Sequence, residues 1–354
     1  MEIRLQLFCC SLLFLGKAHK VAERSEKKQK SPALRISIIT FLAALCVVAV
    51  LVSVSVGKVH YTLAQVLQVF VDTESEAWLL VWNVRLPRVI CGGMVGICLS
   101  LSGCILQGVM RNHLASPSTI GVTSGASFVG YLVLVAFPNY MYILPAGVII
   151  GSFATTMLIY SLAYEKGVSP VKMILSGMAV SAMFAAFNDI IKSFFSDNIS
   201  HSVSFFVGTL NGATWDDLKL IGPYMAVGIV VCFLLPSKMN ILMLGDEMAN
   251  SLGLRVERFR LFLIAVASLL AGSSVAVAGM ISFVGLIVPH ISRLIIGSDY
   301  RYLFPTSIFM GFSFVVICDT IGRVILPVGE MSVSIVLSFI GAPFFLYLLR
   351  KKQS

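Results

Sequence analysis

Long, almost uninterrupted apolar runs alternate with short polar segments along this chain. A membrane-crossing helix needs about 20 predominantly apolar residues. Lipid offers the backbone no hydrogen-bond partners, so a spanning chain forms helices or a closed barrel, and continuous rather than alternating apolar runs favour helices. The pattern predicts an all-α, polytopic membrane protein with about ten transmembrane helices, near residues 34–56, 88–108, 118–137, 141–163, 171–195, 221–236, 259–278, 280–297, 303–323 and 331–349. A shorter apolar run, 202–210, predicts a re-entrant or surface helix.

The composition supports a membrane protein, and the charges indicate its orientation. Hydrophobic residues make up 58% of the chain and charged residues 12%, whereas soluble proteins average about 25% charged. The net charge is +9, and 20 of the 26 Lys and Arg residues fall on one side of the predicted spans. Because positively charged segments stay in the cytoplasm, we predict a multi-pass protein of the cytoplasmic membrane with both termini and the segment 238–258 inside. This distribution favours a lipid bilayer over nucleic acid as the partner of the basic residues.

The first residues are expected to form a cytoplasmic N-terminal extension, 1–33, ahead of one membrane domain, 34–350. The stretch LQLFCCSLLFLG resembles the apolar core of a signal peptide, but no small-residue cleavage site follows it. An unusual extension and a misassigned start codon are both consistent with this stretch.

We predict no catalytic residues, no metal site and no cofactor. The eight cysteines have no metal-ligand spacing, and most fall inside predicted spans, where cysteine behaves as a small apolar residue. The sequence lacks a G-x-x-x-x-G-K-[ST] phosphate loop, which argues against ATP binding in the usual way. The charged residues well inside spans are Asp189, Lys192 and Asp319, fewer than an ion-coupled transporter usually carries.

Basic residues gather where the second span is expected to begin. In WNVRLPR, Trp82 marks a membrane interface, and Arg85 and Arg88 flank Pro87. Two arginines at a helix N-terminus oppose the helix dipole. The pattern therefore indicates either an acidic partner or snorkelling of both side chains to lipid phosphates.

The last outer loop, CDTIGRVILPVGE, places Asp319, Arg323 and Glu330 on the same side as these arginines. Asp319 and Arg323 are four residues apart and can pair on a helix. A purely structural pair and a functional one both remain open.

Small and polar residues mark the inner end of the second span. The stretch GCILQGVMRNHLASPSTIGVTSGA is rich in glycine, which lets helices approach closely. Gln107 and Asn112 can hydrogen-bond across such an interface, and Pro117 lies between them and the third span. Packing is the simplest role for both polar residues.

The eighth span ends in polar groups. In FVGLIVPHISR, Gly285 is followed by Pro289, His290 and Arg293. At a cytoplasmic helix end, basic side chains complement the helix dipole, and Pro289 is expected to kink or break the helix. Since neither His, Cys nor a carboxylate lies near His290 in the sequence, a structural histidine is favoured over a metal ligand or proton carrier.

The longest polar interval, 236–260, predicts a docking element. Within it, Leu244, Met248 and Leu252 recur at helical spacing, and Gly253 is a natural helix stop. The acidic start of this helix argues against an anionic membrane surface. We therefore expect it to dock into a groove on a partner protein.

Several of these stretches together resemble a known family. VRLPR, SGCILQGVMRNHLASPSTIGVTSGA, LGDEMANSLGL, AGMISFVGLIVPHISRLIIGSDYRYLFP and GAPFFLYLL occur in the order found in permease subunits of iron-siderophore, haem and cobalamin ABC importers. The resemblance covers about residues 34–350. It implies a type II ABC importer permease of ten spans, paired with a second permease subunit, identical or paralogous, two cytoplasmic ATPase subunits and an extracytoplasmic substrate-binding protein.

The resemblance also implies roles for individual residues. It implies that segment 244–254 is the coupling helix that sits in a cleft of the ATPase, through Leu244, Gly245, Asp246, Glu247, Ala249, Leu252, Gly253 and Leu254. It implies that Arg85, Arg88 and Arg323 meet acidic residues on the two lobes of the binding protein. We assign structural or gating roles to Pro87, Gln107, Asn112, Pro117, Gly285, Pro289, His290 and Arg293.

The sequence departs from the family pattern at three places. His113 stands where proline is usual, and FFVGTLNGATW displaces the tryptophan to position 215. The family also tends to have a Pro-Val-Gly run after the outer glutamate, where this chain has VGEMSVSIV. These differences leave the substrate open among ferric siderophores, which we favour, haem and cobalamin. The alternatives from other classes are an ion-gradient-driven secondary transporter and a membrane enzyme that uses His290 or Asp189.

Overall fold

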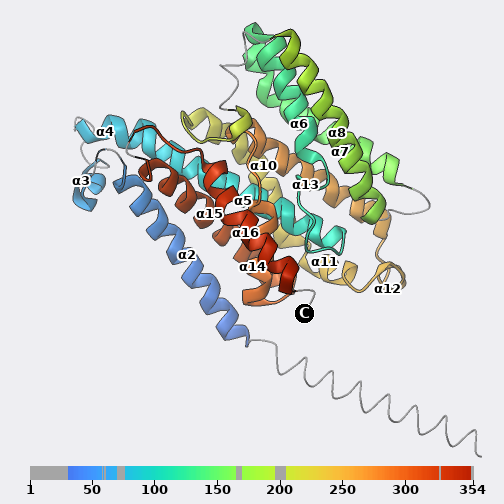
Figure 1. Cartoon of the computed structure of the whole chain (residues 1–354). Helices are drawn as coiled ribbons and strands as arrows, with labels where there is room; N and C mark the ends of the chain where they lie inside the picture. The colour runs from blue at the N-terminus through green and yellow to red at the C-terminus, as the bar shows by residue number, and fades with distance from the viewer. Residues whose placement is uncertain are drawn as a thin grey trace, which may run out of the picture.

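One helix, α5 (Leu86–Val109), lies at the centre of the molecule, and most of the others pack around it (Figure 1). The computed structural model describes residues 31–57, 59, 61–69, 76–164, 170–195, 205–326 and 328–351. Almost every residue of α5 is buried, and α10, α13, α14 and α15 all contact it. A helix that is apolar on all sides is stable only when other helices or lipid surround it.

The remaining elements follow in chain order. They are α2 (Pro32–Ser55), α3 (Leu63–Gln68), α4 (Glu76–Leu80), the π-helical turn η1 (Val81–Arg85), α6 (Val122–Tyr131), η2 (Leu132–Ala136), η3 (Pro138–Ile143), α7 (Leu144–Ala163), α8 (Pro170–Phe194), α10 (Trp215–Leu234), α11 (Pro236–Leu242), α12 (Asp246–Ser251), α13 (Val256–Ala278), α14 (Val284–Ile296), α15 (Tyr300–Val324) and α16 (Val333–Lys351).

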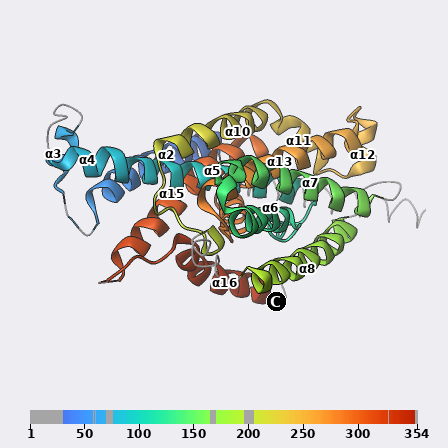
Figure 2. The ribbon, with the colours of Figure 1, turned by 90° about the horizontal axis from the view of Figure 1, so that it is seen from above.

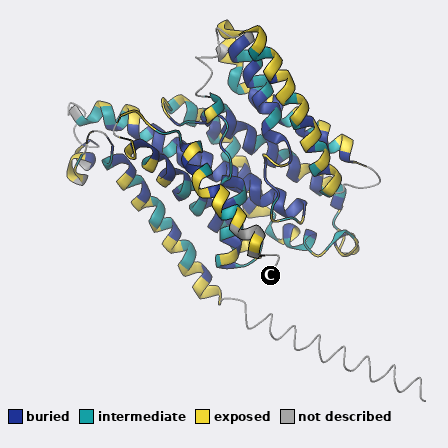
Figure 3. Ribbon diagram, viewed as in Figure 1, coloured by how far each residue is buried: buried dark blue, intermediate teal, exposed yellow. Residues whose placement is uncertain are grey.

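The predicted all-α fold is confirmed, and helices occupy all ten predicted positions. Among the described residues, seven helices are long and apolar enough to cross a membrane, and three shorter apolar helices occupy the other positions: Val122–Val135, Val284–Ile296 and Val333–Leu346. Figure 1 shows α2 and Figure 2 shows α8 at the periphery, and Figure 3 shows that much of their surface is exposed, as expected for helices that face lipid.

The start of the second span was predicted wrongly. The helix does not begin at residue 88, because one continuous helical segment runs from Ala77 to Val109. Its π-turn η1 directly precedes Pro87, and the N–H of Leu86 donates to the carbonyl of Val81, five residues back. This wider turn accommodates a proline that lacks an N–H. Arg85 and Arg88 therefore lie within a helix rather than at its N-terminus.

The eighth span also differs from the prediction. Pro289 does not break α14, which continues to Ile296. The break lies earlier, between α13 and α14, where Gly279 has a φ of 69° and Phe283 a φ of 67°. Backbone at membrane depth can leave the helical conformation where protein surrounds it.

Glycines bring α5 and α14 into direct backbone contact. A Cβ atom on Gly103 would lie 1.8 Å from the carbonyl oxygen of Gly285. A Cβ atom on Gly285 itself would lie 2.9 Å from the carbonyl oxygen of Leu99 and 2.9 Å from Cδ of Pro117. Only glycine fits at both positions, so the small-residue stretch provides close helix packing, as predicted.

Two expectations lie wholly or partly outside the described residues. The N-terminal extension falls almost entirely there, as do Cys9 and Cys10. Of the run 202–210, the described part begins at residue 205, with a single helical turn. The six cysteines that the structure describes are free.

Candidate functional site

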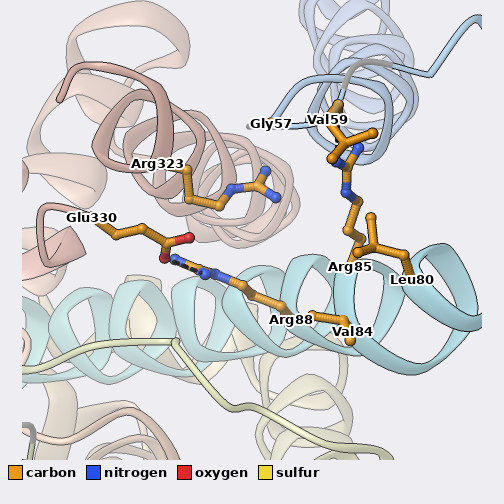
Figure 4. Close-up of a pocket in the computed structure, with 8 residues that line it drawn as sticks. All are labelled: Gly57, Val59, Leu80, Val84, Arg85, Arg88, Arg323 and Glu330. Atoms are coloured by element: carbon orange, nitrogen blue, oxygen red, sulfur yellow. Dashed lines mark hydrogen bonds and ion pairs between the residues drawn. The ribbon is translucent and has the colours of Figure 1, made fainter. Parts of the chain in front are cut away.

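Charged side chains form a cluster at one end of the molecule, where α5 begins and α15 ends. We call Arg85, Arg88, Asp319, Arg323 and Glu330 the arginine cluster. Figure 4 shows Arg88 and Glu330 pointing toward one another beside a cavity of about 190 Å³. The cavity is lined by Gly57, Val59, Leu80, Val84, Arg85, Arg88, Arg323 and Glu330.

Arg88 is the hub of this cluster. Its Nε and Nη2 atoms donate to the two carboxylate oxygens of Asp319, at 3.0 and 2.9 Å, and its Nη1 donates to Glu330 at 2.7 Å. Such a two-pronged contact between guanidinium and carboxylate is among the stronger side-chain pairs. The Asp319 side chain is only 4% exposed, whereas that of Glu330 is 29% exposed. Arg88 thereby ties α5 to α15 and to the loop before α16.

Arg85 and Arg323 bind the C-terminal end of α2. Arg85 Nη1 donates to the carbonyl of Val54 at 2.7 Å, and Arg323 Nη2 donates to the carbonyl of Ser53 at 2.7 Å. The last carbonyls of a helix lack partners within it and carry partial negative charge. The two guanidinium groups satisfy these carbonyls.

The structure therefore offers another explanation for the position of Arg85, Arg88 and Arg323: their partners lie within the chain. All three guanidinium groups are buried and bonded within the chain. The predicted pair of Asp319 and Arg323 is confirmed, with 3.4 Å between Oδ2 and Nε. Sequence reasoning missed the contacts of Arg88 with Asp319 and Glu330 because more than two hundred residues separate the partners.

Gln107 and Arg293 meet where α5 and α14 approach their C-terminal ends. Gln107 Nε2 donates to the carbonyl of Leu286 at 3.3 Å, and Arg293 Nη2 donates to Gln107 Oε1 at 3.3 Å. Gln107 thus bonds across from α5 to α14, as expected. Asn112 instead stabilises its own turn, since its side chain accepts from the N–H of Leu114.

His290 has a neighbour that the sequence did not place beside it. The ring centroids of His290 and His113 are 6.4 Å apart, with the rings edge-on to each other. The ring centroid of Phe344 in α16 lies 6.1 Å from that of His290. His113 is one of the departures from the family pattern. The structure thus brings His290 together with aromatic rings.

At the opposite end of the molecule from the arginine cluster, α11 and α12 form a short helical hairpin (Figures 1 and 2). The helix predicted over 244–254 is shorter than expected. Gly245 has a φ of 108°, a conformation that favours glycine, and helix α12 begins after it. Gly253, with a φ of 81°, ends the helix: its N–H bonds the carbonyl of Asn250, and the N–H of Leu254 bonds that of Ala249. This is the Schellman arrangement, so the predicted helix stop is confirmed.

The two faces of α12 differ sharply. Met248 in α12, Leu244 just before it and Leu252 just after it are 57%, 59% and 58% exposed, whereas Ala249 in α12 is fully buried. Ala249 therefore packs within its own chain rather than on the exposed face. The exposed apolar stripe is left for another surface.

Asp246, the first residue of α12, binds two arginines from elsewhere in the chain. Its Oδ1 atom accepts from Arg111 Nη2 at 2.8 Å and from Arg260 Nη2 at 2.9 Å. Sequence reasoning identified Asp246 only as part of the docking helix. The charged start of α13, VERFR, was the signal that could have revealed Arg260 as a partner.

Comparison with known proteins shows the family. The model of the FecCD transport family matches residues 45–351. The chain belongs to the FecCD transport family. Its relatives include two Fe(3+)-citrate import system permease proteins of Bacillus subtilis, YfmE and YfmD, each 35% identical over 93% of this chain and 98% of their own. The cobalamin import system permease protein BtuC of Halobacterium salinarum is 38% identical over 78% of this chain and 75% of its own.

A solved structure agrees with this assignment. A metal-chelate type ABC transporter in an inward-facing conformation has a TM-score of 0.78, is 29% identical, and covers 89% of this chain and 99% of its own. This FecCD permease therefore has the type II ABC importer permease fold, and it is a transport subunit rather than a catalyst. The matched residues include both the arginine cluster and α12.

Proposed function

We propose that this FecCD permease forms half of the pathway by which an ATP-driven importer carries a ferric chelate, with ferric siderophores as the first substrates to test and haem and cobalamin as alternatives. Support for an iron chelate comes from the YfmE and YfmD relatives, whose names specify Fe(3+)-citrate import. The cobalamin relative BtuC keeps the corrinoid alternative in the panel.

The exposed stripe on α12 is the observation that carries this proposal. Three large apolar side chains are exposed here, Met248 in α12, Leu244 just before it and Leu252 just after it, whereas the other face of α12 is anchored in the chain. An amphipathic helix with exposed anchors at this spacing is suited to a hydrophobic groove. We assign that groove to the ATPase subunit, since this chain lacks a phosphate loop of its own.

The orientation follows from the same assignment. The α12 end faces the cytoplasm, where ATP is hydrolysed, and both termini lie on that side. The 20 of 26 basic residues on the predicted inner segments support this orientation. The arginine cluster then faces outward.

The arginine cluster is the proposed docking surface for an extracytoplasmic binding protein. Its three arginines outnumber its two carboxylates, so the cluster is net positive and attracts acidic groups on a partner. Because the arginines already have partners within the chain, docking must work mainly through this positive field.

We propose that the second permease subunit is a paralogue. YfmD and YfmE are two different permeases named for one import system, and this chain is equally similar to both. The ion-gradient alternative gains no support from the described helices, because the buried carboxylate Asp319 is held by two arginines.

The test is co-purification with candidate ATPase subunits and a binding protein, followed by ATPase assays against ferric siderophores, ferric citrate, haem and cobalamin. Leu244→Ala combined with Met248→Ala should weaken ATPase binding by about tenfold or more, since each anchor contributes about 1 kcal/mol or more. Leu79→Ala is the matched control, because Leu79 is equally exposed but lies in α4 at the other end. ATPase binding that survives the double change would contradict the assignment of α12.

A further inference from the structure

The contacts of Asp246 go beyond the docking of a helix. One carboxylate oxygen, Asp246 Oδ1, accepts hydrogen bonds from two guanidinium groups at 2.8 and 2.9 Å. Arg111 follows α5 directly, and Arg260 lies in the first turns of α13. We call Asp246, Arg111 and Arg260 the α12 clamp. It joins α12 to two transmembrane helices.

The burial of Arg260 makes this contact more than a surface ion pair. Its side chain is 1% exposed, and its second carboxylate partner, Glu257, lies at 3.4 Å on the same helix. A buried guanidinium depends on its carboxylates far more than an exposed one, since water does not replace a lost partner. Loss of the Asp246 carboxylate would therefore leave the buried Arg260 with Glu257 alone.

Arg111 completes the clamp from the other side. It has a φ of 46°, a left-handed conformation rare for a residue with a side chain. This conformation turns the chain at the end of α5 while the Arg111 side chain reaches Asp246. Since α5 contacts α10, α13, α14 and α15, a displacement at its end reaches the whole helix packing.

We propose that Asp246 is the positioning residue that converts movement of α12 into movement of α5 and α13, so that the clamp sets how much transport each ATP hydrolysis achieves. This proposal rests on the proposed function, because it assigns the push on α12 to the ATPase. The two faces of α12 then have separate tasks. The exposed stripe binds the partner, and Asp246 passes the displacement inward.

The test measures substrate uptake and ATP hydrolysis in the same proteoliposomes, with the complete importer. Asp246→Asn and Arg111→Gln should leave ATPase subunits bound and ATP hydrolysis running, while uptake per ATP falls about five- to tenfold, the lower end of the range of a typical coupling between sites. Arg111→Lys should restore most of the ratio because it keeps a positive charge within reach of Asp246. The double variant should be no worse than Asp246→Asn alone, since that change already removes the ion pair with Arg111.

Two controls separate positioning from stability. Asp216→Asn makes the same chemical change in an exposed ion pair with Lys219, away from α12, and should leave the ratio unchanged. Thermal melting of each variant reports its stability. The Arg111 variants should barely alter the melting temperature, because the Arg111 side chain is partly exposed.

An unchanged ratio of uptake to ATP hydrolysis in Asp246→Asn and Arg111→Gln would overturn the proposal. Loss of ATPase binding in these variants would overturn it as well, because Asp246 would then be a contact residue. Failure of the proposed function is distinguishable from both results, since it appears in the unaltered chain as an absence of ATPase binding.

Discussion

Replacement of Arg88 tests whether the arginine cluster is part of the core or a surface feature. In Arg88→Gln, Asp319 keeps only Arg323, at 3.4 Å, and Glu330 loses its 2.7 Å partner. Removing one member of a buried ion pair costs about 3–5 kcal/mol, because the remaining charge stays buried without compensation. We therefore expect Arg88→Gln to lower the free energy of unfolding by about that amount.

The assay is unfolding of the purified protein by SDS in mixed micelles. Arg88→Lys should fall between the native chain and Arg88→Gln, since lysine keeps the charge but not the two-pronged geometry. Combining Arg88→Gln with Asp319→Asn should cost less than the sum of the single changes, because neither buried charge is then left alone.

A matched control sets the scale of this experiment. Lys219→Gln breaks the exposed pair with Asp216, and surface pairs contribute less than about 1 kcal/mol. If Arg88→Gln were no more destabilising than Lys219→Gln, the cluster would not be a buried ion-pair network, and the role of its arginines in holding the helices together would be refuted.

Three further predictions follow from packing, turns and orientation. Gly103→Val places side-chain atoms where the carbonyl of Gly285 lies, so it should destabilise the fold by about 3 kcal/mol in the same SDS assay, and native stability would contradict the close contact of α5 and α14. Gly253→Ala forces alanine into a left-handed turn at a cost of about 1 kcal/mol, visible as faster amide hydrogen exchange in α12, and unchanged exchange would count against this helix stop. In a cysteine-free background, a membrane-impermeant thiol reagent should label Asn211→Cys but not Ser251→Cys in intact cells, and the reverse pattern would end the proposed orientation.

The order and type of the helices could be predicted because lipid leaves few choices. An apolar run of about 20 residues that faces lipid must be a helix, and each of the ten predicted runs contains a helix. The short length of α14 was not predictable from hydropathy alone. Its preceding segment, 279–283, is as apolar as a helix but takes a non-helical path inside the protein.

The start of α5 shows why polar residues mislead such predictions. Polar residues such as Asn83, Arg85 and Arg88 usually mark the boundary of a span, and Pro87 is typical of the first turn of a helix. In the structure the helix continues through them, because a π-turn accommodates the proline and carboxylates and helix carbonyls neutralise the arginines. Both compensations come from residues far away in the sequence.

The exposed apolar residues around α12 could be predicted from their spacing, but the anchoring of α12 could not. The recurrence of Leu244, Met248 and Leu252 gives the exposed stripe directly. The role of Asp246 depends on Arg111, 135 residues earlier, and on Arg260. Such long-range ion pairs leave no periodic pattern in one sequence.

The most direct test of the proposed function is uptake of a ferric chelate by proteoliposomes that contain this permease, its partner permease, ATPase subunits and binding protein. We predict uptake that requires ATP and all of these subunits and that neither a proton nor a sodium gradient can replace. Uptake driven by an ion gradient in vesicles that contain this permease without ATPase subunits would contradict the proposed function.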